Sequence, residues 1–362
     1  MKNKLFSIKN NIHLYPALSG VILGLSRLPI HLGSLVFFAF IPLLYFFLEQ
    51  RKKKEILVAA AAFASAYTLV SLHWISLVTF PGYLGVFALF TAYFYIVFQT
   101  YYFIKQQNLK YGYLAFILVW ISFEYLQNFG EFSFPWFNLG YSLVDYLPFL
   151  QPLEIGGLAL LSLLILVINI LLFELKTNLK RNITIISVII ILWSAYGIIR
   201  LKTINLTKTD FNASIVQVSI PQDKKWEKLY KDSTFTLYKN FSFKAAEETT
   251  DLIIWPESAT PVYLLRNVKY RKWILDLAQD LETNIFTGFP HYIYAGEDYP
   301  NRFRFYNSAT LIGKNREVYV PYYKNILVPF GERIPFLKYF PFLWNIHLGQ
   351  ANWEYGEKLE YY

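Results

Sequence analysis

The sequence predicts a multi-span α-helical membrane domain over residues 1–204, followed by an extracytoplasmic α/β domain over residues 205–362. Hydrophobic residues make up 55% of the 362 positions, aromatic residues 20% and charged residues only 16%, which is too apolar for an ordinary soluble protein of this length. The apolar residues form long blocks, all before residue 202. Short alternating segments replace these blocks after about residue 205, as is typical of a layered α/β domain.

Seven apolar blocks are each roughly 17 to 24 residues long, the length that a helix needs to cross a bilayer. The second is the weakest, because it is short and starts near Pro29. The first follows several lysines, as a signal peptide would, but it lacks a clear small-residue cleavage site and a second block follows it closely. We therefore expect seven retained spans, at 12–28, 32–48, 56–78, 83–104, 111–127, 153–174 and 183–200.

Basic residues mark every second connection between these blocks. They are Lys2, Lys4 and Lys9, then Arg51 to Lys54, then Lys105 and Lys110, then Lys176, Lys180 and Arg181. The positive-inside rule then puts the N terminus in the cytoplasm and residues 205–362 on the opposite side. Topology and anionic lipid head groups thus account for the net charge of +9. Because no zinc-finger, helix-turn-helix or RNA-binding signature accompanies that charge, we expect no nucleic-acid partner.

Strand and helix patterns alternate through the second domain. We expect strands at 212–220, 252–255 and 284–288, helices at 223–248 and 270–281, and a hairpin made by 306–312 and 318–321. Such alternation indicates a layered α/β or α+β domain.

Two segments of this domain carry side chains suited to catalysis. Glu257 follows the strand at 252–255 directly after Pro256, so its carboxylate could be presented where the strand leaves the sheet and act as a general base. Lys324 lies in an apolar, aromatic run, where an ammonium needs an anionic partner such as Glu257 or Glu332. Each also has a plainer interpretation, since a Pro-Glu pair is often only a turn and a lysine can extend its amine into water.

Several motifs in order along the chain resemble those of the apolipoprotein N-acyltransferases, bacterial inner-membrane members of the nitrilase, or carbon–nitrogen hydrolase, superfamily. In the second domain the motifs are VQVSIPQDKKW (216–226), LIIWPESATP (252–261), TGFP (287–290), YNSATLI (306–312) and YYKNILVPFGERIPF (322–336). In the first, GLSRLPIHLGSLVFFAFIPLL (24–44) and FSFPWFNLGYSL (132–143) are similar to the family's first spans and a periplasmic loop.

The resemblance implies a membrane domain that carries a periplasmic αββα sandwich with a Glu-Lys-Cys triad. Glu257 matches the general base, Lys324 the cation that stabilises the oxyanion, and Glu332 a second glutamate of the family. The implied reaction moves an acyl chain from a phospholipid to a cysteine as a thioester, and then to the N-terminal amine of a diacylglyceryl-cysteine lipoprotein. Cysteine suits this role because its thiolate is a strong nucleophile, and lysine places positive charge where the oxyanion develops.

One member of that triad is missing, because the 362 residues contain no cysteine. The resemblance implies a nucleophile beyond Tyr362, so we expect a fragment, or the product of a split gene, that is inactive as written. Ser258 and Ser308 are not replacements, since neither lies in a Gly-x-Ser-x-Gly elbow. The alternative is a non-catalytic lipid- or lipoprotein-binding pseudoenzyme of the same fold. A transporter is disfavoured because paired intramembrane charges are absent from the sequence pattern.

Aromatic residues of the second domain could line a groove for acyl chains or fill the core. Our candidates for substrate binding are Trp226, Phe289 and Phe330. In the fifth span, Glu124 is an ionisable residue with either a functional or a structural role. The five histidines lack metal-ligand spacing, so we predict no metal and no cofactor, and we expect a monomer.

Overall fold

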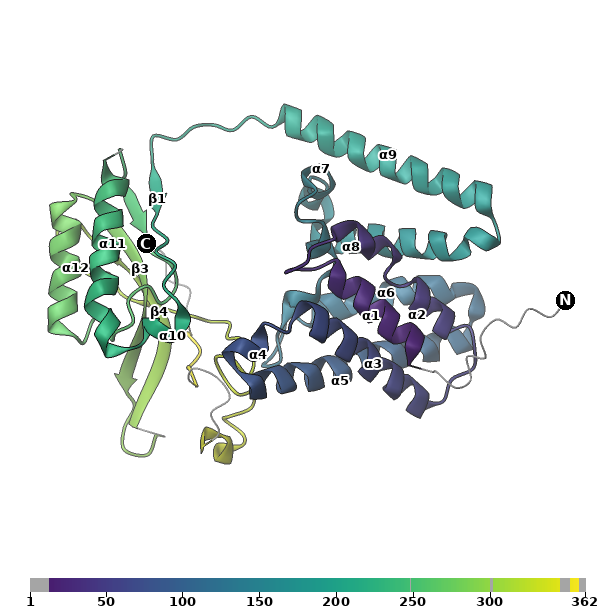
Figure 1. Ribbon diagram of the computed structural model, residues 1–362, viewed down its shortest axis with the longest axis horizontal. Coiled ribbons are helices and arrows are strands. Elements are labelled where there is room, and N and C mark those ends of the chain that lie inside the picture. The colour runs from purple at the N-terminus through teal and green to yellow at the C-terminus, as the bar shows by residue number, and fades with distance from the viewer. Residues whose placement is uncertain (1–12, 248, 300–301, 346–351, 358–362) are drawn as a thin grey trace. The chain divides into compact units, whose positions relative to one another are not determined.

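The computed structural model describes residues 13–247, 249–299, 302–345 and 352–357 (Figure 1). The chain divides into two compact units, residues 1–205 and 206–362. The predicted cytoplasmic residues Lys2, Lys4 and Lys9 lie outside the described part.

Helices are the only regular secondary structure among the described residues of the first unit. Its α-helices are α1 (Leu14–Leu25), α2 (Ile41–Phe46), α3 (Lys53–Ser71), α4 (Ile75–Val78), α5 (Phe80–Gln107), α6 (Gly112–Leu126), α7 (Leu147–Leu150), α8 (Leu153–Phe173) and α9 (Leu179–Thr203). Short 3₁₀ helices connect them: η2 (Gly33–Phe38), η3 (Leu109–Tyr111), η4 (Pro135–Phe137), η5 (Leu139–Leu143) and η6 (Glu174–Lys176).

Four helices of the described chain are long and apolar enough to cross a membrane: Lys53–Ser71, Phe80–Gln107, Leu153–Lys176 and Leu179–Thr203. The other three predicted spans fall on shorter apolar helices, Leu14–Leu25, Gly33–Phe46 and Gly112–Leu126. The second of these is broken, because the 3₁₀ helix η2 precedes the six-residue α2. The predicted span 56–78 is also interrupted, since α3 ends at Ser71 and α4 begins at Ile75. The protein is a membrane protein with an irregular helical unit.

Close contact between α1 and α3 depends on two small residues one turn apart. A Cβ at Gly20 would lie 2.4 Å from the backbone oxygen of Phe63, and one at Gly24 would lie 2.7 Å from Val70 Cβ. Small residues with this spacing let the backbones of membrane helices approach closely. Beside this contact lies an aromatic core, in which the ring of Phe40 lies 4.5 Å from Trp120 and that of Phe63 lies 4.6 Å from Phe94.

Glu124 is a polar centre of the first unit and is only 4% exposed. Its carboxylate accepts hydrogen bonds from the backbone N–H of Leu139 at 2.8 Å and from Ser162 Oγ at 2.5 Å. These bonds tie α6 to the start of η5 and to α8. The contacts therefore favour the structural interpretation of Glu124, because a buried carboxylate needs such partners.

The second unit contains one mixed sheet with the order β1-β2-β3-β4-β5. Its strands are β1 (Ala213–Ile215), β2 (Leu252–Ile254), β3 (Asn284–Tyr294), β4 (Phe303–Ile312) and β5 (Tyr322–Tyr323). The first three strands run parallel, and β4 is antiparallel to β3 and β5. The helical elements of this unit are α10 (Gln222–Lys225), η7 (Lys228–Tyr230), α11 (Lys231–Ala246), α12 (Val268–Asp280) and η9 (Pro341–Asn345).

Helices α11 and α12 lie together on one face of the sheet (Figure 1). Phe235 and Tyr238 of α11 and Ile274 of α12 pack with Ile253 and Ile285 of the central strands in one buried core. The predicted combination of a multi-span helical region and an α/β domain is therefore confirmed. Together, α11, α12 and the sheet form two layers.

Several predicted elements of this unit have different limits in the structure. The strand predicted for 212–220 is much shorter, because β1 covers only Ala213–Ile215. The helix predicted for 223–248 is split near Trp226, so that α10, η7 and α11 follow one another. The strand predicted for 284–288 continues to Tyr294, because β3 pairs with β4 over ten residue pairs. The hairpin partner of β4 is therefore β3, while the predicted segment 318–321 adds a single bridge between Ile312 and Val318.

Candidate active site

Glu257 lies in a loop that is held against the neighbouring strand. The chain leaves β2 at Ile254, and the backbone N–H of Trp255 still donates to Phe286 O at 2.8 Å. A Cβ at Gly288 of β3 would lie 2.7 Å from Ser258 N and 2.9 Å from Glu257 Cα. Only glycine at position 288 lets this loop approach the strand so closely. The sequence around Gly288 thereby sets the position of the Glu257 backbone.

Lys324 follows β5 and points its amine at two carboxylates. Its Nζ lies 2.9 Å from Glu332 Oε1 and 3.4 Å from Glu257 Oε1. Its backbone is held on both sides, because its N–H donates to Asn307 O and its carbonyl accepts from Gly356 N, each at 2.9 Å. The structure therefore brings together two segments that lie 67 residues apart in the sequence.

A tight turn fixes Glu332, the third member of this group. Its Oε2 accepts from the backbone N–H of Val328 at 2.9 Å, and its own N–H donates to Val328 O at 2.9 Å. Phe330 occupies the left-handed region within this turn, with a φ of 63°. These bonds orient the carboxylate so that its other oxygen, Oε1, faces Lys324.

Asn307 is a member of the cluster that was not singled out from the sequence. Its amide Nδ2 donates to Glu257 Oε1 and, at 3.1 Å, to Glu332 Oε1. It lies on β4 and is 6% exposed. The motif YNSATLI contains it, but a single asparagine inside an apolar strand pattern gives no sign of its partners. We refer to Glu257, Lys324, Glu332 and Asn307 below as the charge cluster.

Burial differs among the charged members of the cluster. The side chain of Glu257 is 60% exposed, whereas those of Lys324 and Glu332 are 29% and 16% exposed. Burial by itself would lower the pKa of Lys324, but the hydrogen bond and charge of Glu332, together with the charge of Glu257, outweigh it and raise that pKa above its ordinary value. Lys324 is thus a fixed cation at neutral pH.

A second amine lies within electrostatic reach of Glu257. Burial lowers the pKa of Lys225, at the end of α10, and the negative charge of Glu257 partly opposes this effect. The carboxylate of Glu257 is the most exposed charged group of the cluster, and Lys324 places positive charge beside it.

The three predicted substrate-binding aromatics lie in different surroundings. Trp226 is 38% exposed and lines a pocket of the second unit. Phe289 has no exposed surface and belongs to the core between helices and sheet, so for this residue the core interpretation fits the structure. Phe330 is half-buried in the turn that carries Glu332. Alternation along β3 turns Phe289 inward, which a motif alone does not reveal.

Comparison with known proteins assigns both units to one family. Residues 19–171 match the apolipoprotein N-acyltransferase N-terminal domain, and residues 212–351 match the carbon-nitrogen hydrolase domain. An apolipoprotein N-acyltransferase from Geobacter metallireducens is 29% identical over 98% of this chain and 70% of its own length. The enzyme of that name from Chlorobaculum tepidum is 28% identical over 95% of this chain and 69% of its own.

The chain belongs to the apolipoprotein N-acyltransferase family. A further family member, from Rickettsia typhi, is 31% identical over 65% of this chain and 47% of its own length. The predicted resemblance is thereby confirmed, and the chain is an acyltransferase by family. The charge cluster falls within the residues that match the carbon-nitrogen hydrolase domain.

Proposed function

We propose that the charge cluster is the acid–base and oxyanion-stabilising part of an apolipoprotein N-acyltransferase site. The supporting observation is the convergence of Glu257, Lys324 and Glu332 through hydrogen bonds of 2.9 to 3.4 Å, from segments far apart in the chain. In this proposal Glu257 exchanges protons, Lys324 stabilises the oxyanion, and Glu332 positions Lys324. The donor is a phospholipid, and the acceptor is the N-terminal amine of a diacylglyceryl-cysteine lipoprotein.

The proposed chemistry has two acyl-transfer steps. A thiol gives its proton to Glu257 and attacks the ester carbonyl of the phospholipid, and Lys324 stabilises the resulting oxyanion. When the intermediate collapses, the C–O bond breaks, the lysophospholipid takes the proton and a thioester remains. The acceptor amine then attacks the thioester carbonyl, Glu257 takes a proton from that amine, and the C–S bond breaks to give the amide and the thiol.

The thiol in this scheme has to come from outside the 362 residues, since they contain no cysteine. A chimaera tests this: this chain is followed by the segment of the Geobacter metallireducens enzyme that comes after the matched region, where the family resemblance implies the nucleophilic cysteine. We expect the chimaera to acylate a diacylated lipopeptide in the presence of phosphatidylethanolamine, with an acyl-thioester visible by intact mass spectrometry. The 362-residue chain alone is the negative control.

The pseudoenzyme alternative predicts a different outcome for the same experiment. A folded chimaera that retains phospholipid and lipopeptide but forms neither a thioester nor a triacylated product would contradict the catalytic proposal. That result would leave lipid or lipoprotein binding as the function. The missing thiol in these 362 residues is the observation that favours this alternative.

We propose that the chain lies in a bacterial inner membrane with its N terminus in the cytoplasm and residues 205–362 in the periplasm. The alternation of basic connections along the sequence supports this orientation. Alkaline phosphatase fused after residue 210 should be active, and the same enzyme fused after residue 52 should be inactive. The reverse pattern would overturn the proposed orientation.

A further inference from the structure

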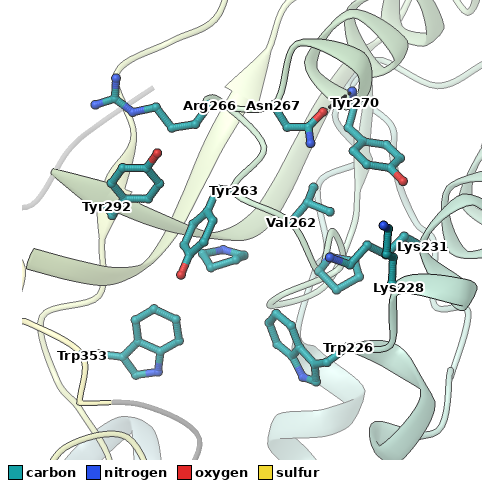
Figure 2. A pocket seen from close by; sticks show the side chains of 12 residues that line it. Trp226, Lys228, Lys231, Val262, Tyr263, Arg266, Asn267, Tyr270, Tyr292 and Trp353 are labelled. Carbon is teal, nitrogen blue, oxygen red and sulfur yellow. Dashed lines mark hydrogen bonds between the residues drawn. The ribbon is translucent and has the colours of Figure 1, made fainter. Parts of the chain in front are cut away.

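The second unit contains a pocket of about 900 Å³ that has no role in the reaction steps proposed above. Five aromatic residues line it, Trp226, Tyr263, Tyr270, Tyr292 and Trp353, together with three cations, Lys228, Lys231 and Arg266 (Figure 2). No carboxylate is among the described residues that line it. The pocket therefore combines apolar walls with uncompensated positive charge.

This pocket adjoins the charge cluster through shared chain segments. The backbone N–H of Trp353 donates to Glu332 O at 2.9 Å. In the sequence, Trp226 directly follows Lys225, and the negative charge of Glu257 partly opposes the lowering of the Lys225 pKa by burial. In Figure 2 both indole rings lie below Tyr263 and Val262, Trp353 on the left and Trp226 to its right. Two residues that line the pocket are thus linked to the charge cluster, one by a backbone hydrogen bond and one through its neighbour in the sequence.

Two of the cations share one wall of the pocket. Figure 2 shows Lys228 and Lys231 near each other on the side of Trp226. Neither has an ion-pair partner among the residues that the structure describes. Asp232, the acid next to Lys231, instead pairs with Lys269 at 2.6 Å and accepts from Tyr270 Oη at 2.8 Å. Both lysines are therefore available to an anion.

Arg266 lies at a different wall and contacts an aromatic ring. Its guanidinium carbon is 5.5 Å from the ring centre of Tyr292, a cation–π contact that occupies the face of that ring. In Figure 2 it lies on the far side of the pocket from the two lysines. We expect Arg266 to add to the positive field without holding the same anionic group.

We propose that Lys228 and Lys231 bind the phosphodiester of the glycerophospholipid acyl donor, while Trp226 and Trp353 contact its apolar part. This inference rests on the proposed function and names the residues that recognise the donor. A phosphodiester suits two adjacent ammonium groups, and the aromatic walls suit the glycerol and acyl chains. The acceptor fits this wall poorly, because its reactive end is an amine that the lysines would repel when protonated.

Direct lipid binding tests this proposal without any acyl transfer. The full 362-residue protein in detergent micelles is titrated with dioleoylphosphatidylglycerol or with dioleoylglycerol, which lacks the phosphate, and bound lipid is counted by native mass spectrometry. We expect the double variant Lys228→Gln/Lys231→Gln to bind the phospholipid about tenfold more weakly, because it loses charge-assisted hydrogen bonds to the phosphate. Its binding of dioleoylglycerol should not change.

The matched control removes the same charge from the same region of the chain. Lys239 and Lys244 lie on α11, are exposed and do not line the pocket. The variant Lys239→Gln/Lys244→Gln should bind phosphatidylglycerol as the unaltered protein does. Equal binding of phosphatidylglycerol by the two double variants would overturn the proposal, because removal of charge from the pocket would then have no more effect than removal of charge elsewhere.

Two more measurements test whether the glutamine variant has simply misfolded and whether the pocket binds free phosphate instead of a phospholipid. Lys228→Arg/Lys231→Arg keeps the charges and should retain phospholipid binding. Millimolar inorganic phosphate should compete only weakly, because it lacks the apolar part; strong competition together with lysine-dependent phosphate binding would assign the pocket to free phosphate and overturn the lipid proposal. None of these binding measurements requires acyl transfer. A failure of lysine-dependent lipid binding, which contradicts this inference, can therefore be distinguished from an inactive chimaera, which contradicts the proposed function.

Discussion

Two glutamates, one in each unit, show how differently the same side chain is used. Glu124 in the helical unit is 4% exposed, and a backbone N–H and a serine hydroxyl hold its carboxylate. Glu257 in the α/β unit is 60% exposed, and one of its oxygens contacts both an ammonium and an amide. The first has neutral hydrogen-bond donors that tie elements together, as a framework residue does. The second can reach water, substrate and a cation, as acid–base chemistry requires.

The largest effect on stability should come from Glu124→Leu. This change leaves the N–H of Leu139 and the hydroxyl of Ser162 without their acceptor inside a packed unit, which costs about 3 kcal/mol. Titration with sodium dodecyl sulfate in mixed micelles measures the free energy of unfolding. Glu124→Gln keeps an oxygen acceptor and should lose less than about 1 kcal/mol. Equal losses in the two variants would mean that the hydrogen bonds do not matter.

Lys324→Ala should lower the rate of acyl transfer by the chimaera about a hundredfold, or about 2.7 kcal/mol, because the oxyanion loses its cation. Lys338→Ala, an exposed lysine of the same unit, provides the control. Thioester formation followed by mass spectrometry measures both rates. A Lys324 variant as fast as the Lys338 variant would show that the oxyanion is stabilised elsewhere.

The stability of the second unit should fall in mild acid because of His291. This side chain is 6% exposed, and burial, assisted by the charge of Arg266, lowers its pKa to about 4. The unfolded chain binds a proton near pH 6.5 while the folded chain does not, so stability is lost as the pH falls from about 6.5 toward 4. Between pH 7 and pH 5 the loss is about 2 kcal/mol. His291→Phe should flatten this part of the pH profile, and an unchanged slope would exclude His291 as its cause.

Asn307→Ala should have the smallest effect, about tenfold on the rate of acyl transfer. The amide holds Glu257 and Glu332 toward each other but carries no charge of its own. Loss of this contact lets Glu257 turn into solvent, so the rate should fall while the unfolding free energy changes little. A large drop in stability without a change in rate would make Asn307 a framework residue like Glu124.

The sequence predicted the broad fold because composition and the length of apolar blocks are local properties. It placed Glu257 and Lys324 by their motifs, and the structure brings them within 3.4 Å of each other. Asn307 could not be found in this way, because its partners lie 50 and 25 residues away and depend on strand register. Nor could the sequence decide whether Phe289 lines a groove or fills the core, since this depends on which face of β3 the helices cover.

Helix limits in the membrane unit were predicted less well for a related reason. Hydropathy reports that residues 56–78 are apolar, but it does not report that the helix breaks between Ser71 and Ile75. The same is true of η2 and α2, which replace one continuous span by two short helices. Breaks of this kind depend on packing against neighbouring helices, and a single apolar pattern does not record that packing.

A paired experiment on the two glutamates tests the central claim most directly. Glu257→Gln and Glu124→Gln are made in the same chimaera, and thioester formation and the free energy of unfolding are measured for each. We predict that Glu257→Gln slows thioester formation by about a thousandfold or more with little change in stability, because it removes the general base. Glu124→Gln should leave the rate per folded molecule nearly unchanged. Near-normal thioester formation by the Glu257 variant would contradict the assignment of the charge cluster as the reactive site.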